Sequence, residues 1–219
     1  HWVRRVMLAR KARLVKHNSR LSQGSLLDIG TGTGYFPHFM QERGWHVSAI
    51  EKSPQARQFA KEHFELDVAA PEALNEFADK SFDVITLWHV MEHLEHLNET
   101  WETLKRILKD QGILIIAVPN PTSFDAEKYK EMWGAYDVPR HLWHFSPSVM
   151  QQFGAKHDFI LCERHPMPFD AFYVSMLSEK YRKSAFPFLK GLIAGTEAWI
   201  VSLAKKDRSS SMIYVFRKK

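Results

Sequence analysis

The sequence predicts a doubly wound α/β fold built on a mostly parallel sheet. Short apolar runs alternate with helical patterns over most of the chain, as in repeated β-α units. The first run, Leu26–Ile29, is stopped by the alternating glycines Gly30, Gly32 and Gly34, which is typical of a buried parallel strand ending in a tight turn. Glu51 then ends the next apolar run. A glycine turn and an acid after neighbouring strands indicate a ligand site at the carboxyl edge of the sheet.

Composition is that of an ordinary globular protein. The 219 residues are 45% hydrophobic and 25% charged, which predicts a single domain, 1–219, with a substantial core. Cys162 is the one cysteine, so the chain cannot form an internal disulfide, and no signal-peptide pattern opens the sequence. We therefore expect a cytoplasmic location.

Basic residues gather in the first segment, 1–22, which is predicted to be an N-terminal basic helix. It holds seven Lys or Arg residues and no acid, within a chain of net charge +5: Arg4, Arg5, Arg10, Lys11, Arg13, Lys16 and Arg20. Such a helix can bind phosphates or an anionic membrane surface. The solvated side of a packed helix is the favoured interpretation, and no nucleic-acid-binding module is recognisable.

Each further element of the first half has its own signal. Ser53-Pro54 gives a helix cap followed by proline at the first helical position. Apolar runs predict strands, and 3.6-residue periodicity predicts the helices between them. In order, the expected elements are a strand Leu26–Ile29, a helix Tyr35–Arg43, a strand His46–Ile50, a helix to His63, a weak strand within Phe64–Ala69, a strand Phe82–Trp88, a helix Asn98–Leu108 and a strand Gly112–Val118.

The second half is less regular. A helix from Ser146 to Gly154 and strands Phe159–Arg164 and Met212–Arg217 are expected. The aromatic-rich segment 120–145 is predicted to be a substrate lid, with plain packing of a long loop as the alternative. Segment 185–206 is predicted to be a helical insertion before the last strand. Its apolar part, 185–204, is too interrupted to span a bilayer. It can lie on a membrane or form an oligomer face, but a helical pair covering the sheet is favoured.

The glycine motif also carries a resemblance. Asp28-Ile29-Gly30-Thr31-Gly32-Thr33-Gly34, followed by Glu51 and by Phe82-Asp83-Val84-Ile85, resembles the class I S-adenosylmethionine-dependent methyltransferases over about Leu26–Val118. This resemblance implies a seven-stranded, Rossmann-like sheet with helices on both faces and S-adenosyl-L-methionine as the cofactor. The spacing G-x-G-x-G differs from the G-x-G-x-x-G of nicotinamide-dependent oxidoreductases, the competing enzyme class.

The resemblance also assigns cofactor roles residue by residue. The glycine loop would contact the amino acid portion, Asp28 its charged tail, and Glu51 the ribose diol. The position of the acid that the family places against adenine falls on Ala70 here, where backbone groups would take its role, and Asp67 and Glu72 stay alternative candidates. The full expected cofactor set is Asp28, Gly30, Thr31, Gly32, Gly34, Tyr35, Glu51, Lys52, Ala70, Trp88 and His89.

Histidines supply the candidate bases. His89, Glu92 and His93 have a spacing that suits a divalent metal, and the second histidine group, Arg140–His144, could add a ligand. Because His89 stands where the metal-dependent E-x-x-E-H set of related enzymes has Glu, we expect no metal. The expected catalytic residues are His89, His93 and His144, because a histidine near neutral pKa is a natural base. The expected substrate-contacting residues are Tyr136, Arg140, His141 and Trp143.

The prediction for function is therefore methyl transfer from S-adenosylmethionine to a small molecule, at oxygen. One alternative is a metal-assisted methyltransferase of an RNA or quinone-type substrate. Another is a non-catalytic protein that binds the cofactor, with the basic helix or the apolar segment 185–204 making its contacts. Peripheral contact with a membrane and the oligomeric state stay open.

Overall fold

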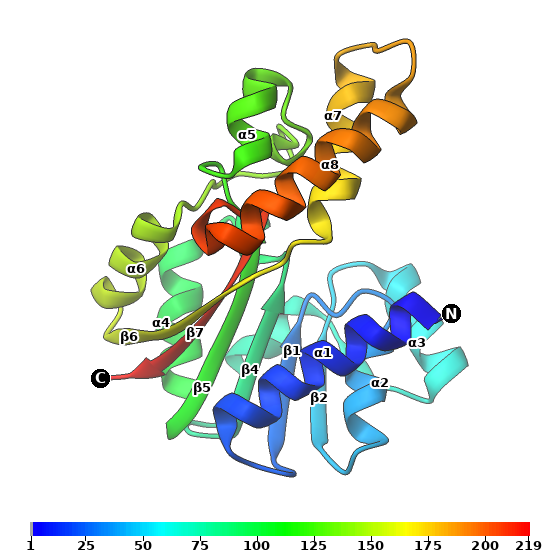
Figure 1. Cartoon of the computed structure of the whole chain (residues 1–219). Helices are drawn as coiled ribbons and strands as arrows, with labels where there is room; N and C mark the ends of the chain where they lie inside the picture. Colours follow the sequence, from blue (N-terminus) through cyan, green and yellow to red (C-terminus); the bar gives the residue numbers. More distant parts are fainter. Residues whose placement is uncertain (1) are drawn as a thin grey trace.

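The computed structural model describes residues 2–219; His1, with which the expected N-terminal segment and domain begin, lies outside them. The described residues form a seven-stranded sheet in the order β3-β2-β1-β4-β5-β7-β6 (Figure 1). β7 runs antiparallel to both of its neighbours, while the other pairs are parallel. The strands are β1 Ser25–Ile29, β2 His46–Ile50, β3 Val68–Ala69, β4 Phe82–Trp88, β5 Leu108–Pro119, β6 Phe159–Pro166 and β7 Ser211–Lys218. The predicted doubly wound fold is confirmed.

Helices cover both faces of this sheet. Alternate side chains of the central strands point to opposite faces, and the strands are buried on both. One face packs against α4 (Leu97–Ile107) and α6 (Pro147–Lys156). The other packs against α1 (Trp2–Ser19) and α2 (Tyr35–Gln41). Asp28, Thr86 and Trp88 all belong to the face that α1 covers, because they share one parity along β1 and β4.

The predicted helix starts at Ser53 and Ser146 are confirmed. The hydroxyl of Ser53 accepts a hydrogen bond from the Ala56 N–H at 3.3 Å and begins α3 (Pro54–Phe64). Ser146 caps α6 in the same way, accepting from Val149 at 3.3 Å. In each helix a proline takes the first position, where a missing N–H costs nothing.

The fifth strand is longer than predicted. It begins at Leu108, four residues before Gly112, and α4 correspondingly ends at Ile107. Leu108 pairs with Phe82, and the register then shifts before Val84 pairs with Ile113. The extra residues form an irregular strand start that apolar periodicity does not reveal.

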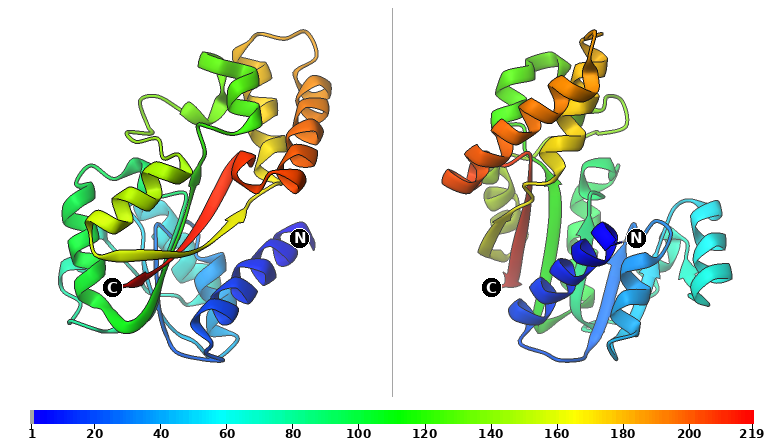
Figure 2. Two further views of the ribbon diagram at one scale, coloured as in Figure 1. Left: turned by 60° about the vertical axis from the view of Figure 1, so that its left-hand side comes forward. Right: turned by 45° about the vertical axis from the view of Figure 1, so that its right-hand side comes forward.

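Three helices stand beyond the carboxyl ends of the parallel strands. These are α5 (Phe124–Tyr129), α7 (Asp170–Tyr181) and α8 (Pro187–Ala204), with short 3-10 turns at Met91–His93, Lys130–Met132, Gly134–Tyr136 and Lys206–Arg208. Figures 1 and 2 show them as a layer above the edge of the sheet. The predicted helical pair within 185–204 is therefore wrong. That stretch is one helix, its partner is the unpredicted α7, and the two do not cover the sheet face. Within residues 2–219, no helix has the length and apolar character that crossing a membrane requires.

Candidate active site at the carboxyl edge of the sheet

The glycine turn joins β1 to α2 in a backbone conformation that favours glycine. Gly30, Gly32 and Gly34 all have positive φ, at 69°, 58° and 82°. A Cβ on Gly30 would lie 2.2 Å from a methyl of Val90, so the turn is pressed against the loop that follows β4. A Cβ on Gly32 would meet nothing within 4 Å. The turn therefore leaves open space on one side of Gly32, where a ligand can approach the main chain.

Asp28 lies under this turn and is buried. Its carboxylate accepts a hydrogen bond from the Thr86 hydroxyl at 2.5 Å. Burial raises the pKa of Asp28 to about 6, although the Thr86 hydrogen bond and the nearby charge of Lys11 oppose the rise. A cation bound nearby would stabilise the ionised form of such a buried carboxylate. The open side of the glycine turn is next to Asp28 and could admit one. The Thr31 hydroxyl, also buried, lies close enough to Asp28 to lower the pKa of that carboxyl but makes no hydrogen bond of ordinary geometry within residues 2–219.

Glu51 follows β2 and is tied to the glycine turn. Its two carboxylate oxygens accept hydrogen bonds from the backbone N–H groups of Gly32 and Ser53, each at 2.8 Å. The neighbouring Lys52 is exposed, with its ammonium 3.9 Å from Glu95. Ala70 precedes the 3-10 turn after β3, and its carbonyl accepts from Ala73. Glu51 thus fixes the position of Gly32 and keeps lone pairs for a ligand hydroxyl.

Trp88 ends β4 and separates the turn from α1. Its ring packs edge-on against Phe36, and the Lys11 ammonium lies 4.3 Å from the ring centroid. Burial lowers the pKa of Lys11, although Asp28 and Asp170 oppose this effect. A cavity of about 140 Å³ lies between α1, Trp88 and segment 165–170. Tyr35, by contrast, is covered by the Arg4 guanidinium, 3.9 Å from its ring centroid. The basic helix was expected to present its cations to solvent, but Lys11 is partly buried beside Trp88 and does not belong to that solvated face.

His89 is held between two carboxylates. Its Nε2 lies 3.1 Å from an oxygen of Asp170 at the start of α7, and its Nδ1 lies 3.4 Å from an oxygen of Glu92. Burial alone would lower the pKa of His89, but its hydrogen bonds with the two acids raise that pKa to about 10. Conversely, the charge and hydrogen bond of His89 outweigh burial and lower the pKa of Asp170. At neutral pH the imidazole is doubly protonated and cannot accept a proton.

Asp170 is a site residue that the sequence pattern does not reveal. It lies 81 residues beyond its partner His89, at the start of a helix that the pattern does not predict. Thr86, which holds Asp28, is likewise an unremarkable strand residue. Thr86 lies directly opposite Asp28 on the neighbouring strand, and this pairing is the feature that could have identified it as a partner of Asp28.

Three further histidines fasten the loop 135–144. His93 Nδ1 lies 2.9 Å from the carbonyl of Arg140, and His141 Nδ1 lies 2.9 Å from that of Ala135. His144 Nε2 lies 3.1 Å from the carbonyl of Tyr136. A carbonyl can only accept, so each of these ring nitrogens carries the proton. In the neutral ring the other nitrogen is then an acceptor, and burial lowers the pKa of His141, which favours its neutral form.

A carboxylate joins these histidines. Glu92 is buried, and atoms of Glu92, His93 and His141 that can ligate a metal all lie within 4.8 Å of one another. Neither oxygen of Glu92 has a hydrogen bond of ordinary geometry among the described residues. The backbone carbonyl of Glu92 accepts hydrogen bonds from the backbone N–H groups of Leu142 and Trp143, which hold loop 135–144 over Glu92. The sequence pattern suggests His89, Glu92 and His93 as a possible set of metal ligands. In the structure the possible set is Glu92, His93 and His141, so His141 replaces His89.

The aromatics of segment 120–145 divide into two groups. Tyr129 and Trp133 are buried in a small core with Val174 and Ala194, and Trp133 donates its indole N–H to Asp125 at 2.8 Å. These residues hold α5 against α7 and α8. Trp143 is instead 42% exposed, and its indole N–H donates to the carbonyl of Leu94. The first half of the segment therefore packs as an ordinary long loop, which was the alternative to a substrate lid.

The second half of that segment carries the expected substrate residues. Tyr136 stacks edge-on against His144, and Arg140 is exposed and paired with Asp137. His141 lies 4.6 Å from His93, centroid to centroid. His141 and the backbone N–H of Trp143 thus lie beside Glu92, whereas Tyr136 contacts His144 and the Arg140 side chain is exposed.

The expected cofactor fits the glycine-turn site on three counts. Open space faces Gly32, the hydroxyl of Thr31 makes no hydrogen bond of ordinary geometry among the described residues, and the buried carboxylate of Asp28 gains from a cation. S-adenosylmethionine brings an ammonium, a carboxylate and a ribose diol, which match these groups and Glu51.

Comparisons with known proteins agree with this geometry. Residues 1–162 match the sequence pattern of a family described as a methyltransferase domain. An uncharacterised methyltransferase of Staphylococcus carnosus is 33% identical over 112 residues, covering 50% of this chain and 53% of the relative. The mitochondrial ubiquinone biosynthesis O-methyltransferase of Schizosaccharomyces pombe is 30% identical over 105 residues, covering 44% of this chain and 38% of that protein. The chain spans about half the length, or less, of these curated relatives.

Solved structures show the same fold. A SAM-dependent methyltransferase from Archaeoglobus fulgidus superposes with a TM-score of 0.63 at 19% identity, covering 98% of this chain and 94% of its own. The 1,6-didemethyltoxoflavin-N1-methyltransferase of Burkholderia thailandensis gives 0.62 at 13% identity, covering 100% and 80%. With its family pattern matched over residues 1–162 and its fold shared with solved methyltransferases, the chain belongs to the class I S-adenosylmethionine-dependent methyltransferases.

Proposed function

We propose that the chain transfers the methyl group of S-adenosylmethionine to an oxygen of a small molecule bound beside loop 135–144. The observation that carries this proposal is the state of the histidines. His93, His141 and His144 each donate one ring N–H to a backbone carbonyl, so in the neutral ring the other nitrogen is an acceptor. An oxygen nucleophile such as a phenol needs that kind of group to remove its proton.

The same geometry divides the roles of the predicted catalytic residues. His89 is protonated between Asp170 and Glu92, so its proposed role is to position or donate a hydrogen bond, not to act as the base. His93 and His144 keep the proposed role of base, and His141 joins them. The names of relatives support oxygen as the acceptor atom, since several are ubiquinone biosynthesis O-methyltransferases.

S-adenosylmethionine supplies a methyl group already activated by a positive sulfur, so the residues of the chain mainly hold and align the reactants. We propose that Asp28, Glu51 and the backbone of the turn at Gly30–Gly34 hold the cofactor. Loop 135–144 then excludes water from the acceptor, and the side chains of Tyr136 and Trp143 contact its apolar part.

Methyl transfer from radiolabelled S-adenosylmethionine to pools of phenols, catechols and carboxylic acids tests the proposal. We expect label in one oxygen-acceptor pool. Among the separate replacements His93→Ala, His141→Ala and His144→Ala, loss of the base should slow turnover by about a hundredfold or more, with little change in cofactor affinity. A pool of amines is assayed beside the oxygen-acceptor pools. Cofactor binding without turnover on any pool would instead favour a non-catalytic protein, and label only on amines would overturn the assignment to oxygen.

A second candidate function is metal-assisted methyl transfer. Glu92, His93 and His141 offer one carboxylate and two imidazoles within 4.8 Å, and the Glu92 carboxylate is buried without an ordinary hydrogen bond to the described residues. Such ligands suit a divalent transition metal or zinc. We expect activity to survive EDTA. Complete loss with chelator, restored by Mg²⁺, Mn²⁺ or Zn²⁺, would replace the first candidate by this one.

A further inference from the structure

The α7–α8 hairpin packs in an unusual direction. α8 buries its small residues against α7 and turns large apolar side chains outward. The buried residues are Gly191, Ala194, Gly195, Ala198 and Ser202. A Cβ on Gly191 would lie 2.5 Å from the Cα of Met176, so the two helices touch through their backbones. An ordinary surface helix does the reverse, hiding its large residues and exposing its polar ones.

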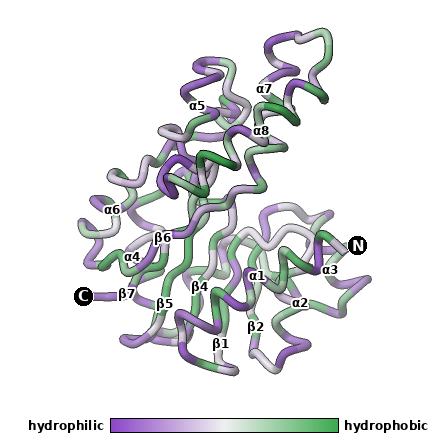
Figure 3. The backbone as a smooth tube through the Cα atoms, viewed as in Figure 1, coloured by the Kyte–Doolittle hydropathy of each residue, from purple (hydrophilic) through white to green (hydrophobic). Residues whose placement is uncertain are grey.

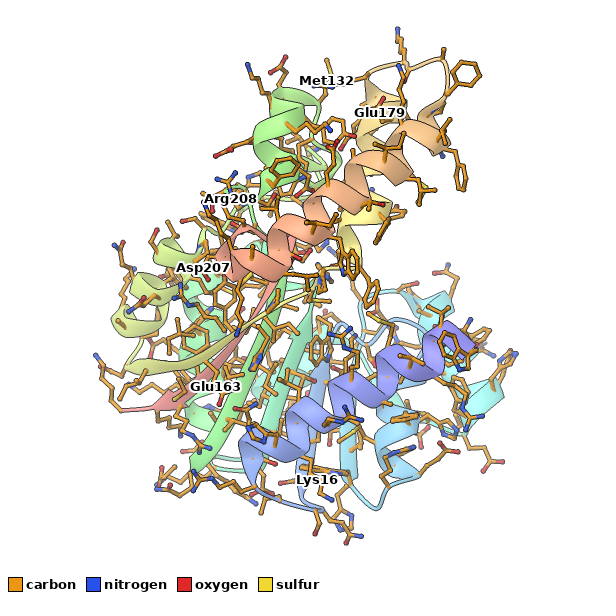
Figure 4. All side chains as sticks on the ribbon, viewed as in Figure 1. Lys16, Met132, Glu163, Glu179, Asp207 and Arg208 are labelled. Atoms are coloured by element: carbon orange, nitrogen blue, oxygen red, sulfur yellow. The ribbon has the colours of Figure 1, made fainter. Side chains whose placement is uncertain are left out.

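The exposed surface of α8 is largely apolar, with Thr196 and Glu197 as exposed polar residues near its middle. Leu189, Ile193, Ile200 and Leu203 are each 54–62% exposed, and Leu192 is 43% exposed. The turn into α8 adds two aromatic residues, since Phe186 and Phe188 are 67% and 70% exposed. Figure 3 shows strongly hydrophobic backbone along α8, and Figure 4 shows side chains projecting freely from it. Contiguous apolar surface of this kind marks an interaction site.

Charge decides which partner fits. Residues 170–206 contain six basic and three acidic residues. Each of the three acids has a partner: Asp170 pairs with His89, the exposed Glu197 with Lys128, and Glu179 is buried beside Tyr129. The cations are exposed. They are Lys180, Arg182, Lys183, Lys190, Lys205 and Lys206, and apart from Arg182 none bonds to another described residue through its side chain.

We propose that the α7–α8 hairpin binds an anionic lipid bilayer, with Phe186, Phe188 and the outer face of α8 entering the interface. An apolar face with exposed aromatics and exposed cations has the composition of an interfacial anchor. A second protein would need its own acidic rim, whereas an anionic leaflet supplies negative charge on every side of an inserted hairpin. Insertion at the interface also agrees with the finding that α8 does not qualify as a spanning helix.

The α7–α8 hairpin is connected to the candidate active site. The residue that opens α7, Asp170, is the partner of His89 in the candidate active site. Phe186 and Phe188 lie beyond the other end of α7, so this helix would connect a bilayer at the hairpin tip to the candidate active site. The inference is independent of the methyl acceptor, and binding is measured without turnover.

Flotation with vesicles tests the proposal. The full chain is mixed with vesicles of phosphatidylcholine alone or of phosphatidylcholine and phosphatidylglycerol at 70:30, and the bound fraction is measured. We expect binding to the anionic vesicles that weakens at 0.5 M NaCl. The double replacement Phe186→Ser with Phe188→Ser should weaken binding by at least tenfold, and Lys183→Glu with Lys190→Glu by a similar factor. Ile160→Ser, 51% exposed on β6, is the matched apolar control and should change nothing.

Every outcome bears on the proposal. All replaced residues are exposed, and an unchanged thermal transition verifies that each variant is folded. Absent vesicle binding by the folded chain would overturn the proposal. So would hairpin variants that bind as strongly as the Ile160→Ser control. A stable dimer in analytical ultracentrifugation that the Phe186 and Phe188 replacements dissociate would assign the face to a second copy of the chain instead.

Discussion

Asp28→Asn should stabilise the protein without ligand and abolish its affinity for the cofactor. Burial raises the pKa of Asp28 from 3.8 to about 6, so the ionised carboxylate is less stable in the folded chain than in the unfolded one. A rise of that size corresponds to about 3 kcal/mol. The penalty is absent below pH 3.8, grows as the pH rises to 6 and is complete above it. Asparagine avoids the penalty.

Part of that gain is offset, because a neutral amide accepts the Thr86 hydrogen bond more weakly and its own N–H groups need partners. Deducting about 1–2 kcal/mol for this leaves a net stabilisation of about 1–2 kcal/mol at pH 7.5. For a chain of this size, that is a rise in melting temperature of about 2–8 °C. Urea unfolding at pH 7.5 and pH 4 measures the difference, which should reverse in sign at the lower pH, where little of the penalty remains and the cost of the amide is left. S-adenosylhomocysteine should no longer raise the melting temperature of the variant.

Asp83→Asn is the matched control on β4. Although burial opposes it, hydrogen bonds from Lys109 and Ser25 lower the pKa of Asp83, so this replacement should destabilise the chain at pH 7.5. If Asp28→Asn also destabilises the chain at pH 7.5, or keeps its affinity for S-adenosylhomocysteine, the assigned role of Asp28 is wrong.

The remaining predictions concern the turn, His89 and the loop. Gly32→Ala should fold, at a cost of about 1 kcal/mol for its positive φ, but weaken S-adenosylhomocysteine more than tenfold in calorimetry, because its Cβ enters the open space; unchanged affinity would place the ligand elsewhere. Asp170→Asn should lower the pKa of His89 from about 10, so that its ring, followed by NMR, loses its proton at lower pH than in the wild type. An identical titration would mean that Asp170 does not hold the charge. Tyr136→Ala and His144→Ala should each reduce turnover while leaving cofactor affinity within a few-fold; loss of cofactor binding or of folding would make the loop a structural brace.

The sheet and its glycine turn could be predicted because their signals are local. Buried parallel strands read as continuous apolar runs, and the three glycines are spaced as a turn with positive φ requires. The caps at Ser53 and Ser146 are equally local, since each hydroxyl serves an N–H three residues ahead.

The layer of α5, α7 and α8 could not be predicted in the same way. Helix prediction assumes that large apolar residues face inward, whereas α8 buries glycine and alanine and exposes Leu and Ile. The charge state of His89 was hidden for a different reason. It depends on Asp170, which is distant in sequence, and a histidine without its partners looks like a base.

The glycine turn and Glu51 form the proposed binding site for S-adenosylmethionine. Isothermal titration of S-adenosylhomocysteine into the wild-type chain and into Glu51→Ala tests it most directly, with urea unfolding to verify that the variant is folded. We predict one site per chain in the wild type and an affinity at least tenfold weaker in Glu51→Ala. Absent binding to the wild type, or equal binding to a folded Glu51→Ala variant, would contradict the account.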